Sequence, residues 1–218
     1  MSTLAATLPM AINWAPSPEI FSVGPIHIRY YSVLFVSGFI IGYYIFVKFF
    51  KREGLPVEIL DVLLYTLLGS AVIGARLGHC LFYEPEYYLA RPLEILKVWE
   101  GGLASHGGAI AILIAIWYYV KRYGKKHGFD YMWLLDRIAV ATPLAGALIR
   151  LGNLMNSEIY GNPTDLPWGF VFLLRGETIP KHPTQLYETL AYLVTFAVLM
   201  LLYFKALPRL KKGTLFGL

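Results

Sequence analysis

Five apolar blocks, each long enough to cross a bilayer, constrain this chain more than any other feature. They lie at 32–50, 59–83, 101–120, 133–153 and 184–204. A helix of about 20 residues spans about 30 Å, which is the thickness of the hydrocarbon core. Only 15% of the residues are charged, against roughly 25% in a soluble domain. We therefore predict an all-α polytopic membrane protein with about five transmembrane helices, rather than a soluble helical protein.

Lys and Arg are distributed unequally between the loops, which predicts the orientation. The positive-inside rule places the more basic loops in the cytoplasm and the amino terminus outside. Loop charge beside anionic lipid accounts for the net charge of +5, so we expect no nucleic-acid partner. The cytoplasmic group is Lys48, Lys51, Arg52, Lys121, Arg122, Lys125, Lys126, Lys205, Arg209, Lys211 and Lys212; the outer group is Arg29, Arg91, Lys97, Arg175 and Lys181.

The stretch ALIRLGNLMNSEIYG combines a membrane helix with a polar stripe. A charge inside the bilayer is costly, so Arg150 marks a candidate functional site. Helical spacing places Asn153 on the same face and Asn156 at its flank. Glu158 and Gly161 follow where the helix should end. Arg binds phosphate with a planar fork of donors, so the stripe suits an anionic head group. The alternative is a buried Arg150–Glu158 pair that only joins helices.

Two further polar clusters lie near the outer side. In GGLASHGGAI (101–110), His106 lies between glycine pairs that permit close approach of a backbone or ligand. A histidine there can exchange protons near neutral pH, although a packing histidine is the alternative. In HPTQLYE (182–188), Glu188 lies in an apolar block, so we expect an arginine of another helix as its partner. A purely structural ion pair is the alternative there.

Other polar side chains in the blocks are interpreted more modestly. The second block carries Arg76, His79 and Tyr83 on one face, and the fourth carries Asp136 and Arg137 near its cytoplasmic end. We predict that the last two form a helix-end or structural pair. Tyr30 and Tyr31 come just before the first block and open its helix at the outer interface, where an aromatic belt alone would explain them.

Together these motifs resemble the prolipoprotein diacylglyceryl transferase family. RLGNLMNSEIYG matches an Arg-x-Gly-Asn-x-x-Asn-x-Glu-x-x-Gly signature, and IRYYSVLFVSGF, GARLGHCLFYEPEYY, VWEGGLASHGGAI and HPTQLYE agree in order and spacing. The resemblance covers roughly residues 20–216. It implies a bacterial inner-membrane enzyme whose active site faces the periplasm. Such an enzyme moves the diacylglyceryl group of phosphatidylglycerol to the lipobox cysteine of prolipoproteins, releasing glycerol 1-phosphate, in the first step of lipoprotein maturation.

The resemblance also implies roles for individual residues. Arg150, His106 and Tyr31 correspond to the family's catalytic positions, with Tyr30 as an alternative one residue away. Arg150 would bind the lipid phosphate, and His106 would act as a general base or orient groups. The other phosphatidylglycerol-binding positions are Asn153, Asn156, Glu158 and Gly161, and the supporting positions are Arg76, His182 and Glu188.

The expected partners are phosphatidylglycerol, prolipoprotein signal peptides with a lipobox cysteine, and the bilayer. The single cysteine excludes a multi-cysteine metal site, and the family implies no metal or organic cofactor. We expect residues 1–218 to form a single membrane transferase domain. Family members continue through further helices, one of which carries a second important arginine, so we expect this chain to be truncated at its carboxyl end.

Three other functions fit parts of the pattern. A non-catalytic membrane protein that binds or transports anionic phospholipid would use the same arginine stripe, often with an inverted repeat that this sequence lacks. An intramembrane protease would need a nucleophile and base that meet, and no pair is convincing. A haem protein would need His79 and His106 to face one another, which is a weak pattern.

Overall fold

The computed structural model describes residues 11–24, 26–98 and 101–218. Its contacts divide the chain into two compact units. The first comprises Met1–Tyr44 and Ala139–Leu210, and the second comprises Ile45–Ile138 and Lys211–Leu218. Trp99 and Glu100, which belong to the VWEGGLASHGGAI motif, lie outside the described residues.

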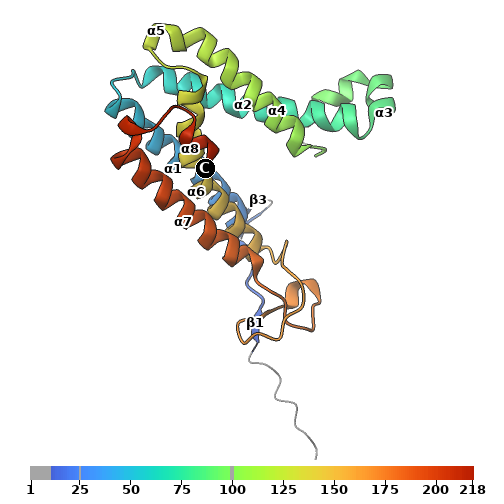
Figure 1. The fold of residues 1–218 in the computed structure, drawn as a ribbon. Helices are drawn as coiled ribbons and strands as arrows, with labels where there is room; N and C mark the ends of the chain where they lie inside the picture. The colour runs from blue at the N-terminus through green and yellow to red at the C-terminus, as the bar shows by residue number, and fades with distance from the viewer. Residues whose placement is uncertain (1–10, 25, 99–100) are drawn as a thin grey trace, which may run out of the picture. The chain divides into compact units, whose positions relative to one another are not determined.

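Among the described residues, four helices are long and apolar enough to cross a membrane (Figure 1). They are α1 (Tyr30–Arg52), α2 (Glu58–Phe82), α6 (Tyr131–Met155) and α7 (Thr184–Lys205). Each coincides with a predicted apolar block to within a few residues. The chain is therefore a multi-pass membrane protein, and the predicted helical fold class is confirmed.

The remaining block begins its helix later than predicted. Helix α4 (Ser105–Tyr119) begins four residues late, because Gly101 and Gly102 have φ of 90° and 66°, outside the helical region. A π-helical turn η3 (Val120–Gly124) and a short α5 (Lys125–His127) continue it. Gly128 then ends the helix in a left-handed conformation with φ of 78°.

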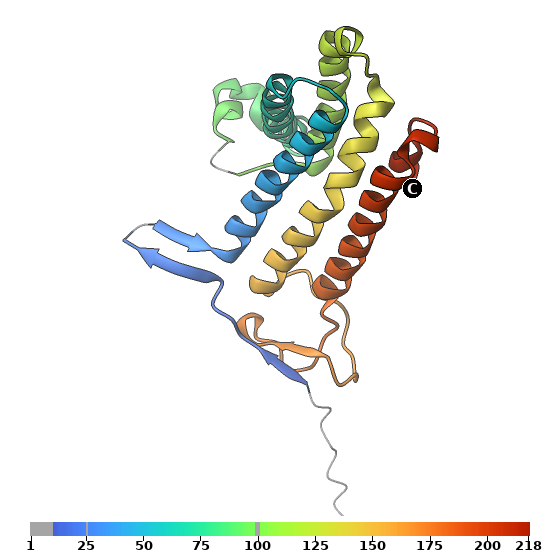
Figure 2. The same ribbon diagram turned by 90° about the vertical axis from the view of Figure 1, so that its left-hand side faces the viewer.

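The first unit packs the beginning of α1, the end of α6 and the whole of α7 side by side (Figure 2). Small residues permit the approach: Gly38 on α1 lies against Ala145, and Gly146 lies against the ring of Tyr192 on α7. Without the strong hydrophobic force of water, helices in lipid associate through such close van der Waals contacts.

Short strands cover the end of this unit and were not predicted. Strand β1 (Ile12–Trp14) pairs in parallel with β4 (Phe170–Phe172), and β2 (Glu19–Val23) forms an antiparallel hairpin with β3 (Ile26–Arg29). A small apolar core joins β4 to α6 through Leu154, Phe170 and Phe172. Short 3-10 turns, η4 (Leu173–Arg175) and η5 (Leu207–Arg209), follow β4 and α7.

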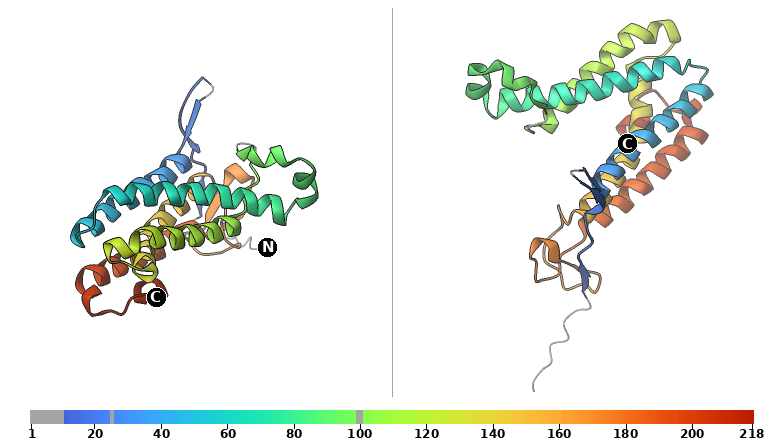
Figure 3. Two further views of the ribbon diagram at one scale, coloured as in Figure 1. Left: turned by 90° about the horizontal axis from the view of Figure 1, so that it is seen from above. Right: turned by 180° about the vertical axis from the view of Figure 1, so that it is seen from behind.

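The second unit is built on α2 and α4, which lie side by side in both views of Figure 3. A Cβ added to Gly74 would lie 2.6 Å from the carbonyl oxygen of Gly107. A Cβ added to Gly78 would lie 2.7 Å from the Cα of Gly107. The two backbones therefore touch directly, which requires glycine at all three positions. Helix α3 (Pro85–Ala90) and the 3-10 helix η1 (Pro92–Leu96) follow α2.

Asp136 and Arg137 both have structural roles, as predicted, but they do not pair with each other. Arg137 donates from Nη2 to Glu53 at 2.7 Å. The Asp136 carboxylate accepts the backbone N–H groups of Gly213 and Phe216 beside α8 (Thr214–Gly217). Neighbouring residues on a helix point about 100° apart, so the two side chains reach different elements.

Candidate functional site

The end of α6 shapes the signature region of the first unit. Ser157 adopts a left-handed φ of 54° two residues after Met155, the last residue of α6. Its N–H bonds the carbonyl of Leu154, and the N–H of Glu158 bonds the carbonyl of Asn153. This is the hydrogen-bond pattern of a Schellman motif, which usually has glycine where Ser157 stands. The reversal turns Glu158 back towards the last turn of the helix.

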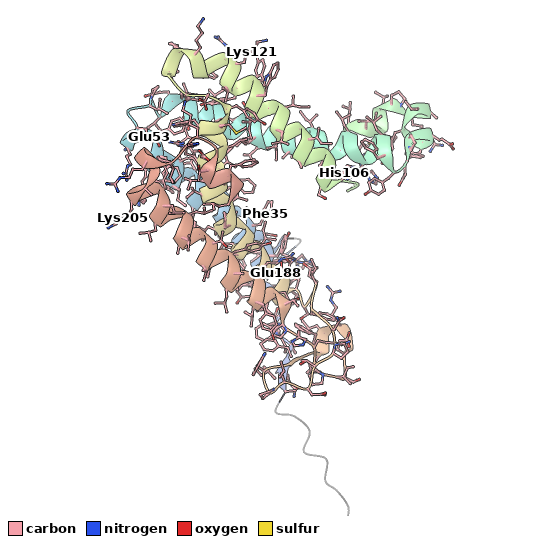
Figure 4. All side chains as sticks on the ribbon, in the orientation of Figure 1. Phe35, Glu53, His106, Lys121, Glu188 and Lys205 are labelled. Carbon is pink, nitrogen blue, oxygen red and sulfur yellow. The ribbon has the colours of Figure 1, made fainter. Side chains whose placement is uncertain are left out.

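Arg150 is held by an ion pair from a neighbouring helix, as predicted for Glu188. The distance from Arg150 Nε to Glu188 Oε2 is 2.6 Å, and Figure 4 labels Glu188 on α7. Arg150 Nη1 also donates to Asn153 Oδ1 at 3.3 Å. Arg150 is about a quarter exposed. The contacts found among the described residues use Nε and Nη1, and none of them uses Nη2.

Glu158 accepts hydrogen bonds from the two signature amides and does not pair with Arg150. Its Oε1 accepts Nδ2 of Asn153 at 2.9 Å and Nδ2 of Asn156 at 3.2 Å. Asn153 is 4% exposed and uses its two amide atoms to join Arg150 to Glu158. The alternative of an Arg150–Glu158 pair is therefore wrong, because a buried amide stands between the two charges.

The sequence interpretation missed Arg175, which completes this network. Its Nη2 lies 3.7 Å from Glu158 Oε2, and its Nε and Nη2 donate to the carbonyls of Ser157 and Asn156. Arg175 lines an open cavity of about 420 Å³ together with Ser157, Glu158 and Tyr160. The only available signal was its position in a long Gly- and Pro-rich loop, which gives no indication of a partner.

A second contact on the same loop perturbs two ionisable groups. The Tyr160 hydroxyl donates to Glu177 Oε1 at 2.8 Å, and Lys181 Nζ lies 3.3 Å from the other oxygen. The hydrogen bond to Glu177 raises the pKa of Tyr160. The hydrogen bond from Tyr160, assisted by Lys181, lowers the pKa of Glu177. The main cause of both pKa shifts is one hydrogen bond between a neutral phenol and a carboxylate.

Gly161 and His182 meet directly. The N–H of Gly161 donates to the carbonyl of His182 at 2.9 Å. A Cβ on Gly161 would lie 3.0 Å from His182 Cβ and 2.6 Å from Thr184 Cγ2. The His182 ring lies 3.2 Å, through Nδ1, from the Tyr187 hydroxyl. Gly161 therefore permits a close contact between the loop and the start of α7, and the His182 backbone completes it.

Tyr31 and Tyr30 differ in their surroundings. The Tyr31 ring lies against Gly152 of the signature, where an added Cβ would be 2.7 Å from Tyr31 Cδ2. The Tyr30 residue is 37% exposed, and its backbone N–H donates to the carbonyl of Pro18. Of the two tyrosines, Tyr31 is the one that touches the signature helix.

His106 belongs to the second unit, where it is the second residue of α4 and is exposed (Figure 4). Its ring centroid lies 5.3 Å from that of Phe82 and 5.8 Å from that of Tyr83. His79 stacks on Tyr83 with a centroid distance of 5.6 Å. Both histidines thus contact the Tyr83 ring. Arg76, predicted as supporting, lies one helical turn before His79 and is buried.

These features define a class of protein: a multi-pass membrane protein with a guanidinium, amide and carboxylate network at the end of an apolar helix. A model of the family described as "prolipoprotein diacylglyceryl transferase" matches residues 18–218. The chain therefore belongs to the prolipoprotein diacylglyceryl transferase family, as the motifs predicted.

Several relatives support this membership. A protein named phosphatidylglycerol–prolipoprotein diacylglyceryl transferase from Tolumonas auensis is 49% identical over 94% of this chain and 78% of its own length. One of the same name from Chloroherpeton thalassium is 48% identical over 94% of this chain and 75% of its own. A third protein of this name, from Porphyromonas gingivalis, is 47% identical over 91% of this chain and 72% of its own length.

Proposed function

We propose that this chain transfers the diacylglyceryl group of phosphatidylglycerol to the lipobox cysteine of prolipoproteins, at the outer face of the bacterial inner membrane. The names of the relatives and the family membership support this activity. The observation that carries the proposal is the Arg150 guanidinium, held by Glu188 and Asn153 through Nε and Nη1. Such a fixed cation at the end of a membrane helix suits a phospholipid phosphate.

The reaction forms one bond and breaks another. The cysteine thiol loses its proton, and the thiolate sulfur attacks the glycerol carbon that carries the phosphate. A carbon–sulfur bond forms, the carbon–oxygen bond breaks, and glycerol 1-phosphate leaves. Arg150 stabilises the negative charge that builds on the departing phosphate ester. His106 accepts the thiol proton as a general base, and Tyr31 contributes to catalysis beside the signature.

The other predicted residues have binding and supporting roles in this proposal. Asn153, Asn156, Glu158 and Gly161 form the wall of the head-group site, and the Glu158 contacts hold both amides in place. Glu188 orients Arg150, and His182 supports Gly161 through its backbone carbonyl. Arg76 supports His106 in the second unit. The chemistry assigned here uses side chains of this protein and no cofactor.

Transfer of label tests the proposal. Membranes containing the chain receive phosphatidylglycerol labelled in its acyl chains and a lipobox peptide, with a Cys→Ser peptide as control. We expect label on the Cys peptide alone, loss of transfer by at least about 100-fold in Arg150→Ala, and only partial activity in Arg150→Lys, which lacks the planar fork. Full transfer by Arg150→Ala at equal protein level contradicts the proposal. Lipid binding without any product favours the non-catalytic alternative.

A further inference from the structure

Arg76 is a buried cation that donates hydrogen bonds to four backbone carbonyls of the described residues. Only 3% of the residue is exposed, although it lies on a helix long and apolar enough to span a membrane. Its Nε donates to the carbonyl of Ile95 at 3.0 Å and its Nη2 to that of Glu94 at 2.6 Å. Its Nη1 donates to the carbonyl of Gly101 at 2.6 Å, with Gly102 at 3.4 Å.

These contacts suit a guanidinium and no other side chain. A planar fork of five donors can bond several carbonyls on different sides at once, whereas an ammonium is a compact point charge. The guanidinium also lies 5.1 Å from the ring centroid of Tyr88, which stabilises a cation by its π face. Arg76 thus joins residues 94–95, at the end of η1, to residues 101–102, shortly before α4 begins.

Other residues of α2 close to Arg76 contact the chain between Gly102 and Gly107. The Ala75 carbonyl accepts the N–H of Ala104 at 2.8 Å. An added Cβ on Gly102 would lie 2.6 Å from His79 Cδ2 and 2.8 Å from Arg76 Nη1, so the guanidinium and imidazole enclose this glycine. Gly78 contacts Gly107, the residue directly after His106.

His106 is therefore placed by a backbone that α2 holds before and after it. We propose that Arg76 is a positioning residue for His106: its hydrogen bonds hold the backbone at residues 94–95 and at residues 101–102, and so set where the imidazole lies at the start of α4. The inference rests on the proposed function only in taking His106 as the general base. A misplacement of about 1 Å at a catalytic group can cost about 100-fold in rate.

Arg76→Lys is the test, because it keeps the positive charge and most of the volume but removes the fork. We expect kcat to fall about 10- to 100-fold, with little change in the KM for phosphatidylglycerol. The matched control is Arg91→Lys, an exposed arginine in the same region that stacks on Tyr87 at 4.9 Å. Rates are compared per folded protein in the membrane, and the control should retain at least half of the wild-type rate.

A double-mutant cycle with His106→Asn separates positioning from general structural damage. If Arg76 acts through His106, adding Arg76→Lys to His106→Asn lowers the residual rate no further. If Arg76→Lys costs the same factor in both backgrounds, or raises KM and leaves kcat unchanged, the inference is overturned and the proposed function stands. Full activity of His106→Asn, with Arg150→Ala inactive, overturns both the role of His106 and this inference while the transferase activity survives.

Hydrogen exchange gives a readout that does not depend on turnover. Peptides covering 94–108 should exchange faster in Arg76→Lys, while those from α7 should not change. Unchanged exchange over 94–108 overturns the inference.

Discussion

Glu188 on α7 and Arg150 on α6 form an ion pair of 2.6 Å that crosses between two apolar helices. The Glu188 carboxylate engages the inner nitrogen, Nε, while Nη1 donates to Asn153 Oδ1. Glu188 thereby offsets the charge of Arg150 through Nε.

Glu188→Gln should weaken phosphatidylglycerol binding more than it slows chemistry. Gln retains the shape but not the charge, so Arg150 loses its electrostatic anchor and becomes less well oriented. We expect the KM for phosphatidylglycerol to rise about tenfold, equivalent to about 1.4 kcal/mol, in a transfer assay with varied lipid content. Glu86→Gln, on the exposed surface of α3, should leave KM unchanged. An unaltered KM in Glu188→Gln would refute the orienting role.

Gly152→Ala should damage the site through Tyr31. The new Cβ would lie 2.7 Å from Tyr31 Cδ2 and 3.2 Å from its Cα, and a backbone atom cannot swing away. Overpacking of this kind costs about 1–3 kcal/mol, so we expect a lower melting temperature in detergent and at least a tenfold lower transfer rate. The matched variant is Gly42→Ala on α1, where nothing lies within 4 Å. Equal behaviour of the two alanine variants would disprove the contact.

Ser157→Gly should stabilise the protein. Ser157 has φ of 54°, a conformation that costs an L-residue about 1–2 kcal/mol and glycine much less. Its buried hydroxyl has no hydrogen-bond partner within the part of the chain that the structure describes. Removing it should therefore raise the free energy of unfolding by about 1 kcal/mol and preserve transfer, as measured by denaturant titration and the label assay. A loss of transfer would show that the hydroxyl has a functional partner.

The Tyr160–Glu177 hydrogen bond predicts a pH window for loop stability. The pKa of Glu177 is below its usual 4.5, so its contribution is fully present above pH 4.5 and is lost as pH falls through the lowered value. The pKa of Tyr160 is above its usual 10.0, so its contribution is lost only as pH rises beyond that value. The melting temperature of Glu177→Gln should therefore lie below that of the wild type between these limits, and the gap should close in acid. A gap that is constant down to pH 3 would contradict this assignment.

The long helices could be predicted because a block of about 20 apolar residues matches the thickness of the bilayer core. A helix is the arrangement that satisfies the backbone hydrogen bonds of such a block in lipid. The need of Glu188 for an arginine partner followed from the cost of a buried charge, and Arg150 meets it. The start of α4 was misplaced because the positive φ of Gly101 and Gly102 depends on the tertiary contacts of Arg76 and His79, which the local pattern does not contain.

Other features were beyond sequence reasoning for similar reasons. Strands β1 and β4 have three residues each, too few for a period-two pattern to stand out. The reversal at Ser157 uses a residue that is uncommon in the left-handed region, so the return of Glu158 to Asn153 was not predictable. Arg175 contacts Glu158 from a loop. The position of a loop residue depends on the tertiary structure, so the local sequence pattern does not predict its partner.

The indole of Trp14 donates to the carbonyl of Leu154, across 140 positions of sequence, and β1 pairs with β4 beside it. Trp14 is therefore synthesised well before Leu154 and β4, which are its partners in the fold. The strand pair at this end of the first unit can thus be completed only after β4 has been synthesised, late relative to β1.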